Sequence, residues 1–192
     1  FKKINPNINI KIFHNESNKG IGFNYYAITK KALGEYYMMV NGDAVDPPSE
    51  IKKIISNIGK ADMVLTYLND KRGIFRRTVS KMFVILINLI TFNNLKYYNG
   101  PNVHLLENVK LYSGKRSGFG YQAELITTQI RQKKTYIEVK IDPYSKPSGS
   151  DFTSQSLNPR NIPSVIGSVI SIFLNQTVYA IKKILKINWI NL

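Results

Sequence analysis

The chain has 192 residues, 43% of them hydrophobic, which is enough for the core of one domain and cramped for two. Its formal net charge of +15 favours polyanionic partners: nucleic acid, anionic lipid or phosphorylated substrates. The absence of cysteine excludes disulfides and thiolate metal sites, so a metal would be held by oxygen donors or by His14 and His104. Oxygen donors favour a hard ion such as Mg²⁺ or Mn²⁺.

The first half of the sequence alternates strand and helix patterns. Helical spacing runs over residues 23–33 with Gly34 as its stop, and Pro47 and Pro48 suit the first turn of a second helix. Around these helices, apolar patterns predict strands at 8–13 (INIKIF), 35–40 (EYYMMV) and 61–68 (ADMVLTYL). Nothing after Phe1 has the pattern of a signal peptide, and since no methionine precedes it we expect a fragment without its true N-terminus.

This alternation predicts an α/β fold with a mainly parallel sheet, because each helix can provide the crossover between parallel strands. In such sheets ligands bind at the carboxyl ends of the strands. Asn41, Gly42 and Asp43 follow the 35–40 strand and therefore lie at the expected ligand edge. Asp43 is the candidate metal ligand there, and the alternative is an ordinary turn, for which Asn-Gly-Asp is typical chemistry.

The second half adds further helices and a closing strand. Residues 76–92 begin basic and continue as an apolar helix that is too short to span a bilayer, which favours core or interface burial. Residues 118–134 have the pattern of an amphipathic helix, 135–141 that of a strand, and 142–161 the composition of a loop.

Residues 161–181 carry no charged side chain, and basic residues flank them on both sides. That length could span a membrane, but the serine, asparagine, glutamine and threonine within it fit an interfacial helix nearly as well. An ordinary amphipathic C-terminal helix is the third possibility.

A short glycine-bearing loop precedes the first predicted helix. Backbone N–H groups and a lysine in this loop could approach a nucleotide, and an ordinary loop is the alternative. The candidate residues are Asn18, Lys19, Gly20 and Gly22.

Several segments occur together in an order that is typical of one enzyme family. They are NKGIGFNYYAITKKALGEYYMMVNGD (18–43), the two prolines, RGIFRRTVSKMF (72–83), YYNGPN (97–102), GFGYQAEL (118–125), YIEVKI (136–141) and KPSGS (146–150). Together they resemble the inverting GT-A-type glycosyltransferases of family two, and in particular the dolichyl- or polyprenyl-phosphate sugar synthases. The resemblance implies a Rossmann-like three-layer GT-A sandwich that lacks its first strands, over residues 1–160, followed by a C-terminal apolar and basic helical segment over 161–192.

The resemblance also implies roles for individual residues. An Asp-x-Asp motif in this family binds Mg²⁺ or Mn²⁺ and the donor diphosphate; here Asn41 stands in its first place, Gly42 in the middle and Asp43 in its second. The 18–22 loop would border the nucleotide, and Glu124 would be the general base for a hydroxyl acceptor. A phosphate acceptor needs no base, and Glu124 would then orient groups or be an exposed helix residue.

Basic side chains take the phosphate-binding positions of the same resemblance. Arg72, Arg76 and Arg77 would steady phosphates of donor or acceptor, and a solvated basic helix start is the alternative. Lys146 stands where arginine is usual, so it keeps the charge but loses the planar fork of a guanidinium. His14 and His104 are expected to be structural.

The expected function is transfer of a sugar from a nucleotide-diphosphate-sugar, with inversion, to a polyprenyl phosphate or a membrane-linked glycan. The enzyme would sit at the cytoplasmic face of the membrane, peripherally or anchored by its C-terminal segment. One alternative is a non-catalytic GT-A-like domain that binds membranes or polyanions, favoured by Asn41 and by the absence before Phe1 of the family's nucleoside-binding segments. Nucleic-acid binding is not expected, because most aromatic residues lie in apolar strand and helix patterns rather than beside exposed basic residues.

Overall fold

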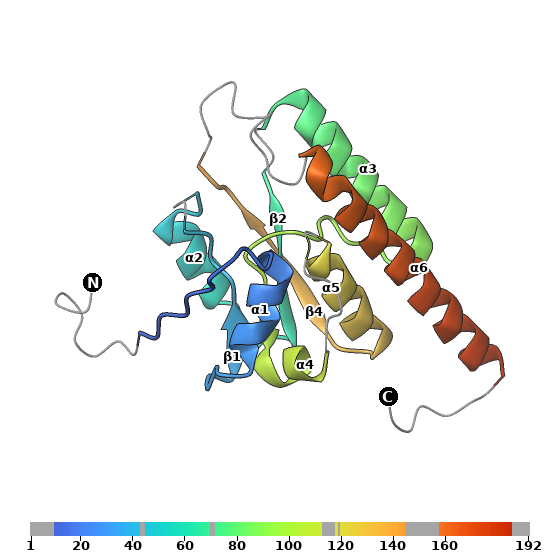
Figure 1. Cartoon of the computed structure of the whole chain (residues 1–192), viewed down its shortest axis with the longest axis horizontal. Helices are drawn as coiled ribbons and strands as arrows, with labels where there is room; N and C mark the ends of the chain where they lie inside the picture. Colours follow the sequence, from blue (N-terminus) through green and yellow to red (C-terminus); the bar gives the residue numbers. More distant parts are fainter. Residues whose placement is uncertain are drawn as a thin grey trace.

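The computed structural model describes residues 10–42, 45–69, 72–112, 118, 120–144 and 158–185, arranged as shown in Figure 1. In chain order the described elements are α1 (Ile21–Thr29), β1 (Tyr36–Met38), α2 (Pro48–Ile55), β2 (Met63–Leu68), α3 (Ile74–Thr91), β3 (Val103–Leu105), α4 (Leu106–Leu111), α5 (Tyr121–Arg131), β4 (Tyr136–Ile141), η3 (Pro159–Asn161) and α6 (Ile162–Ile184).

The strands form one mixed sheet in the order β1-β3-β2-β4. Strand β3 pairs antiparallel with β1 on one side and with β2 on the other, and β2 pairs in parallel with β4 from Met63 opposite Tyr136 to Leu68 opposite Ile141. Strands β1, β2 and β4 therefore run in the same direction, and their carboxyl ends meet at one edge.

Alternate side chains of β2 point to opposite faces of the sheet, and each face is covered by helices. Met63 and Leu65 pack with α3, α5 and α6 in a cluster that contains the fully buried Ile87 and Ile126. Val64 packs on the opposite face with Ile54 of α2, together with side chains of β3 and β4. A third cluster joins α1, α4 and the start of α5.

Two sequence predictions about the sheet are wrong. The sheet is not mainly parallel, because the short strand β3 lies antiparallel between β1 and β2. The predicted strand 8–13 is not a strand over its described part, 10–13, where Ile12 is 89% exposed. Alternation indicates a possible buried face, but a strand also needs a neighbour for its backbone hydrogen bonds.

The other predicted elements are present with shifted ends, and three described elements were not predicted, one of which is the 3-10 helix η3 within the predicted loop 142–161. The helix expected at 23–33 is α1, which ends at Thr29, five residues before Gly34. Strand β3 and helix α4 are new, at three and six residues long. The apolar helix expected at 76–92 is α3, but only Ile87 and Thr91 within it are fully buried.

Candidate active site at the carboxyl edge of the sheet

The sheet edge that the sequence predicted as the ligand edge carries Asn41 and Gly42, which follow β1 and are exposed. Asp43 lies outside the described residues. Helix α1 returns to the start of β1, and α5 to the start of β4, through short turns, so the N-termini of both helices lie toward this edge (Figure 1). Helix α3 starts just beyond the carboxyl end of β2.

Polar side chains gather at this edge that sequence reasoning did not single out. The amide of Asn69, directly after β2, donates to Asp142 Oδ1 at 2.8 Å, and Asp142 directly follows β4. The backbone N–H of Asp142 donates in turn to Glu50 Oε2 at 3.1 Å, in the first turn of α2. Asn69 and Asp142 both directly follow a strand. The same rule that selected Asp43, that ligands bind at the carboxyl ends of strands, could therefore have found them.

Asn41, Asn69, Asp142 and Glu50, the polar side chains described along this edge, offer oxygen atoms, and oxygen donors are the ligands that hard divalent ions prefer. Among the residues that the structure describes, no group of three His, Asp or Glu side chains is placed to hold a metal. His14 and His104 do not form a pair: His14 is exposed, and His104 is 1% exposed with Nδ1 3.1 Å from the side-chain nitrogen of Gln129. Burial lowers the pKa of His104 to about 4, so its ring is neutral at physiological pH.

The glycine-bearing loop before α1 has the conformation that its residues favour. Asn18 Oδ1 accepts a hydrogen bond from the backbone N–H of Gly20 at 2.9 Å. Gly20 has φ of 86°, in the left-handed region where a side chain is strained, and it is the residue before the first turn of α1. Gly22 is buried within α1, and Lys19 is exposed.

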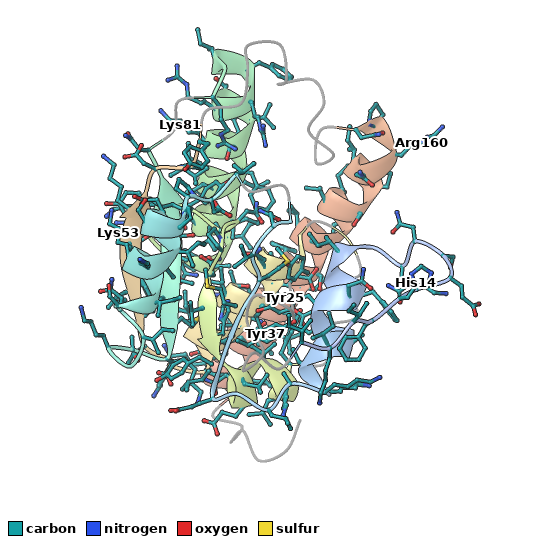
Figure 2. All side chains as sticks on the ribbon, turned by 90° about the vertical axis from the view of Figure 1, so that its left-hand side faces the viewer. His14, Tyr25, Tyr37, Lys53, Lys81 and Arg160 are labelled. Atoms are coloured by element: carbon teal, nitrogen blue, oxygen red, sulfur yellow. The ribbon has the colours of Figure 1, made fainter. Side chains whose placement is uncertain are left out.

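A cluster of tyrosines joins α1 to β1, α4 and α5. The hydroxyl of Tyr37 on β1 donates to the carbonyl of Tyr25 at 2.8 Å, and the two rings, labelled in Figure 2, pack edge to face with their centres 4.8 Å apart. Tyr121 Oη lies 3.2 Å from the sulfur of Met39, just beyond β1. Burial raises the pKa of Tyr37 to about 12 and that of Tyr26 further, so these hydroxyls stay protonated. The cluster packs α1 and α5 against the same face of β1, the one that carries Tyr37 and Met39.

Glu124 lies in the first turn of α5 and is 3% exposed. Its Oε2 accepts hydrogen bonds from the hydroxyl of Tyr112 at 2.9 Å and from Ser171 of α6 at 3.3 Å. The alternative that Glu124 is an exposed helix residue is therefore wrong. The carboxylate joins three segments: the end of α4, the start of α5 and the middle of α6.

The three arginines are close in sequence at the start of α3. Arg76 and Arg77 lie in its first turn, and the guanidinium of Arg72 lies 5.9 Å from the ring centre of Tyr97. Cations at a helix N-terminus oppose the helix dipole, at a cost of about 0.3–1 kcal/mol each. Helix stability therefore does not explain this placement.

A buried hydrogen-bond network links the centre of the sheet to α5. Asn102 Oδ1 accepts from the backbone N–H of Thr66 at 2.7 Å and from its hydroxyl at 3.1 Å, and Asn102 Nδ2 donates to Gln122 Oε1 at 2.8 Å. The segment YYNGPN, noticed only through the resemblance, thus holds α5 against β2. A Cβ on Gly100 would overlap the hydroxyl of Thr66, so the close approach of this loop to β2 needs a glycine.

The predicted site residues that are described thus lie on segments that the topology brings to one edge of the sheet, while Asp43 and Lys146 lie outside the described residues. A search of curated proteins found no match. The sequence pattern of the family described as "Glycosyl transferase family 2" matches residues 2–120, more than half of the chain, and this stretch contains β1, the arginines of α3 and the Asn102 segment. The chain therefore belongs to glycosyl transferase family 2.

Proposed function

We propose that the protein transfers a sugar from a nucleotide-diphosphate-sugar to a polyprenyl phosphate or a membrane-linked glycan, with inversion at the anomeric carbon. The observation that carries this proposal is the family match over residues 2–120 together with the sheet edge at which β1, α1, α3 and α5 converge. On this proposal the mixed sheet is part of a GT-A domain, the domain extends over 1–160, and 161–192 is a membrane-associated segment.

The reaction is a single displacement. An oxygen of the acceptor attacks the anomeric carbon from the face opposite the diphosphate, the bond between that carbon and the diphosphate oxygen breaks, and the nucleoside diphosphate leaves with the electron pair. Asp43, with Asn41 beside it, would hold Mg²⁺ or Mn²⁺, and a bound divalent ion neutralises charge on the departing diphosphate. The 18–22 loop would border the nucleotide.

The roles proposed for the basic residues and for Glu124 depend on whether the acceptor is a phosphate or a hydroxyl group. A phosphate acceptor is already ionised, and Arg72, Arg76, Arg77 and Lys146 would hold it or the donor phosphates through charge-assisted hydrogen bonds. For a hydroxyl acceptor, Glu124 would take the proton. The burial of Glu124 and its bonds to Tyr112 and Ser171 support a positioning role when the acceptor is a phosphate.

The test is Asp43→Ala in the full-length enzyme, assayed with labelled nucleotide-sugars and polyprenyl phosphate with and without Mg²⁺. Removing the metal carboxylate should lower transfer by about 100-fold or more, on the scale of losing one transition-state contact to developing charge. Asp62→Ala is the matched control, because Asp62 is a half-buried carboxylate before the amino end of β2, away from the candidate site, where it accepts a hydrogen bond from Thr135. Wild-type transfer in Asp43→Ala would overturn the assignment.

A second candidate, a non-catalytic domain that binds membranes or polyanions, is favoured by Asn41 in place of a metal-binding aspartate. Donor hydrolysis or sugar transfer by the full-length chain would exclude it.

A further inference from the structure

Helix α3 presents an apolar face to the outside of the protein. Its exposed side chains recur every three or four residues, as one stripe along the helix: Ile74, Phe75, Thr78, Lys81, Met82, Ile85, Leu86 and Leu89, continued by Phe92. Its inward side includes polar groups, such as Asn88, whose side chain bonds Leu95 and Tyr98. Since Phe83, Val84, Ile87 and Ile90 pack on the core, α3 is apolar on both sides, whereas a helix that faces water carries polar residues on its outer side.

Helix α6 lies beside α3 (Figure 1), and it too exposes large apolar side chains while Val169 and Ile172 pack on the core. Small polar side chains face the protein: Ser168 is fully buried, and Ser171 donates to Glu124 on α5. The exposed positions carry the large apolar residues Ile162, Ile166, Ile170, Phe173, Leu174, Val178, Ile181 and Ile184, each at least 46% exposed. Small residues within the packing seam and large apolar ones outside are the arrangement of helices that contact lipid.

Contacts along the side of α6, rather than at one of its ends, fasten it to the protein. A Cβ on Gly118 would overlap Ser164, and one on Gly120 would overlap Ser168, so α6 approaches the start of α5 very closely. Further along, Ile172 is 1% exposed in the main core cluster, and Gln176 Nε2 donates to the carbonyl of Thr91 on α3 at 3.4 Å. The attachment therefore extends over more than three helical turns.

The charges on the two helices have one sign. Neither α3 nor α6 contains Asp or Glu, and Arg160 and Lys81, labelled in Figure 2, are exposed beside the apolar residues. Lys81 also lines a pocket of about 310 Å³ with Lys96, Tyr67, Tyr97 and the exposed Ile85, so a cationic and aromatic recess adjoins the apolar stripe. An anionic headgroup above an acyl chain has the matching chemistry.

We propose that the outward faces of α3 and α6, here called the α3/α6 face, dock lengthwise on an anionic lipid bilayer, with both helix axes parallel to the membrane plane. By length and composition Pro159–Ile184 could cross a bilayer, with 11% of its most apolar window buried. A crossing α6 would, however, carry the flanks of α3 and α5 into the hydrocarbon, including the buried carboxylate of Glu124. Lying in the interface, the pair keeps these contacts and still buries its apolar side chains. This proposal does not rest on the proposed sugar transfer.

A second copy of the chain is a weaker candidate for the occupant of this face. In a symmetric interface the same surface of both copies meets, so the basic residues of α3 and α6 would face those of the second copy. These like charges would repel each other, in a chain whose net charge is already +15. A bilayer that contains anionic lipid instead attracts each exposed Lys or Arg, by about five-fold in affinity per residue.

The absence of cysteine allows single environment-sensitive fluorophores to be placed without background labelling. The full chain carries Leu89→Cys on α3 or Phe173→Cys on α6, and Ile55→Cys on α2 as the control, since these side chains are 68%, 55% and 51% exposed. Vesicles of phosphatidylcholine with phosphatidylglycerol should shift the fluorescence emission of the labels at 89 and 173 to the blue and leave the emission of the label at 55 unchanged. With vesicles of phosphatidylcholine alone, the blue shift at 89 and 173 should be small.

The other outcomes overturn the proposal. A shift at position 173 without one at 89 means that α6 crosses or enters the membrane alone. A shift at both positions that depends on protein concentration and needs no vesicles means that a second copy covers the face. No shift at either position means that the face binds no bilayer.

Sedimentation with the vesicles tests whether basic residues of this face contribute to binding. Lys81→Gln should weaken binding about five-fold in low salt, while Lys53→Gln on α2, at a similarly exposed lysine, should not. Equal weakening by both variants contradicts docking through this face.

Discussion

His104 makes the stability of the protein sensitive to mild acid. The ring is fully buried on β3, and desolvation lowers its pKa from 6.5 to about 4; the hydrogen bond with Gln129 raises the pKa and offsets only part of this effect. In the unfolded chain the imidazole takes up a proton near pH 6.5, while the folded chain resists protonation until about pH 4. The free energy of unfolding therefore falls as the pH drops through this window, by about 3 kcal/mol in total and by about 2 kcal/mol between pH 7.5 and 5.

Urea denaturation followed by circular dichroism at several pH values between 7.5 and 5 measures this loss. The chain has only two histidines, so each can be replaced in turn. In His104→Gln the fall between pH 7.5 and 5 should nearly disappear, while His14→Gln, which changes an exposed ring, should keep it. An equal fall in wild type and His104→Gln would refute the reasoning.

Three further variants test contacts described above. Gly120→Ala should destabilise the protein by about 1–3 kcal/mol, because the new Cβ overlaps Ser168, whereas Gly42→Ala, with open space around it, should change the urea midpoint little. Asn102→Ala should cost about 2–4 kcal/mol by the same measurement, since its buried partners on β2 and α5 lose their hydrogen bonds. Arg76→Gln should leave stability unchanged or raise it by up to about 1 kcal/mol, because a cation leaves the helix N-terminus, while sugar transfer falls; a parallel loss of both would contradict a phosphate role.

The order of most elements could be predicted from the sequence, because their apolar periods are local. Helix α2 has Pro48 in its first turn, Glu50 near its N-terminus and Lys52 and Lys53 in its last turn, which are local signals that a sequence shows directly. Strand β3 could not be found in this way: it has three residues, and α4 follows without a break at Leu106. Its antiparallel direction depends on pairing with β1 and β2, which are distant in the sequence, and a local residue pattern cannot predict such pairing.

The rule that ligands bind at the carboxyl ends of strands predicted one part of the candidate site, and it missed another part because it was applied to only one strand. The strand-end rule pointed to Asn41 and Gly42, and it also fits Asn69 and Asp142, which the structure joins by a hydrogen bond. Composition identified 76–92 as an apolar helix and 161–181 as an uncharged segment, but composition does not tell which side chains face the core and which face outward. The buried Ser168 and Ser171 contacts supply the missing information.

The parallel pairing of β2 with β4 also has a consequence for how the chain is made. Residues 63–68 cannot complete their hydrogen-bonding until residues 136–141 have been synthesised, because the two strands are paired along their whole length. Contacts so far apart in sequence slow folding, and the growing chain exposes the apolar side chains of β2 in the meantime. A shortened chain that stopped at residue 120, where the family match ends, would leave that edge of the sheet permanently open to other chains. Expression boundaries for this protein should therefore extend beyond Ile141.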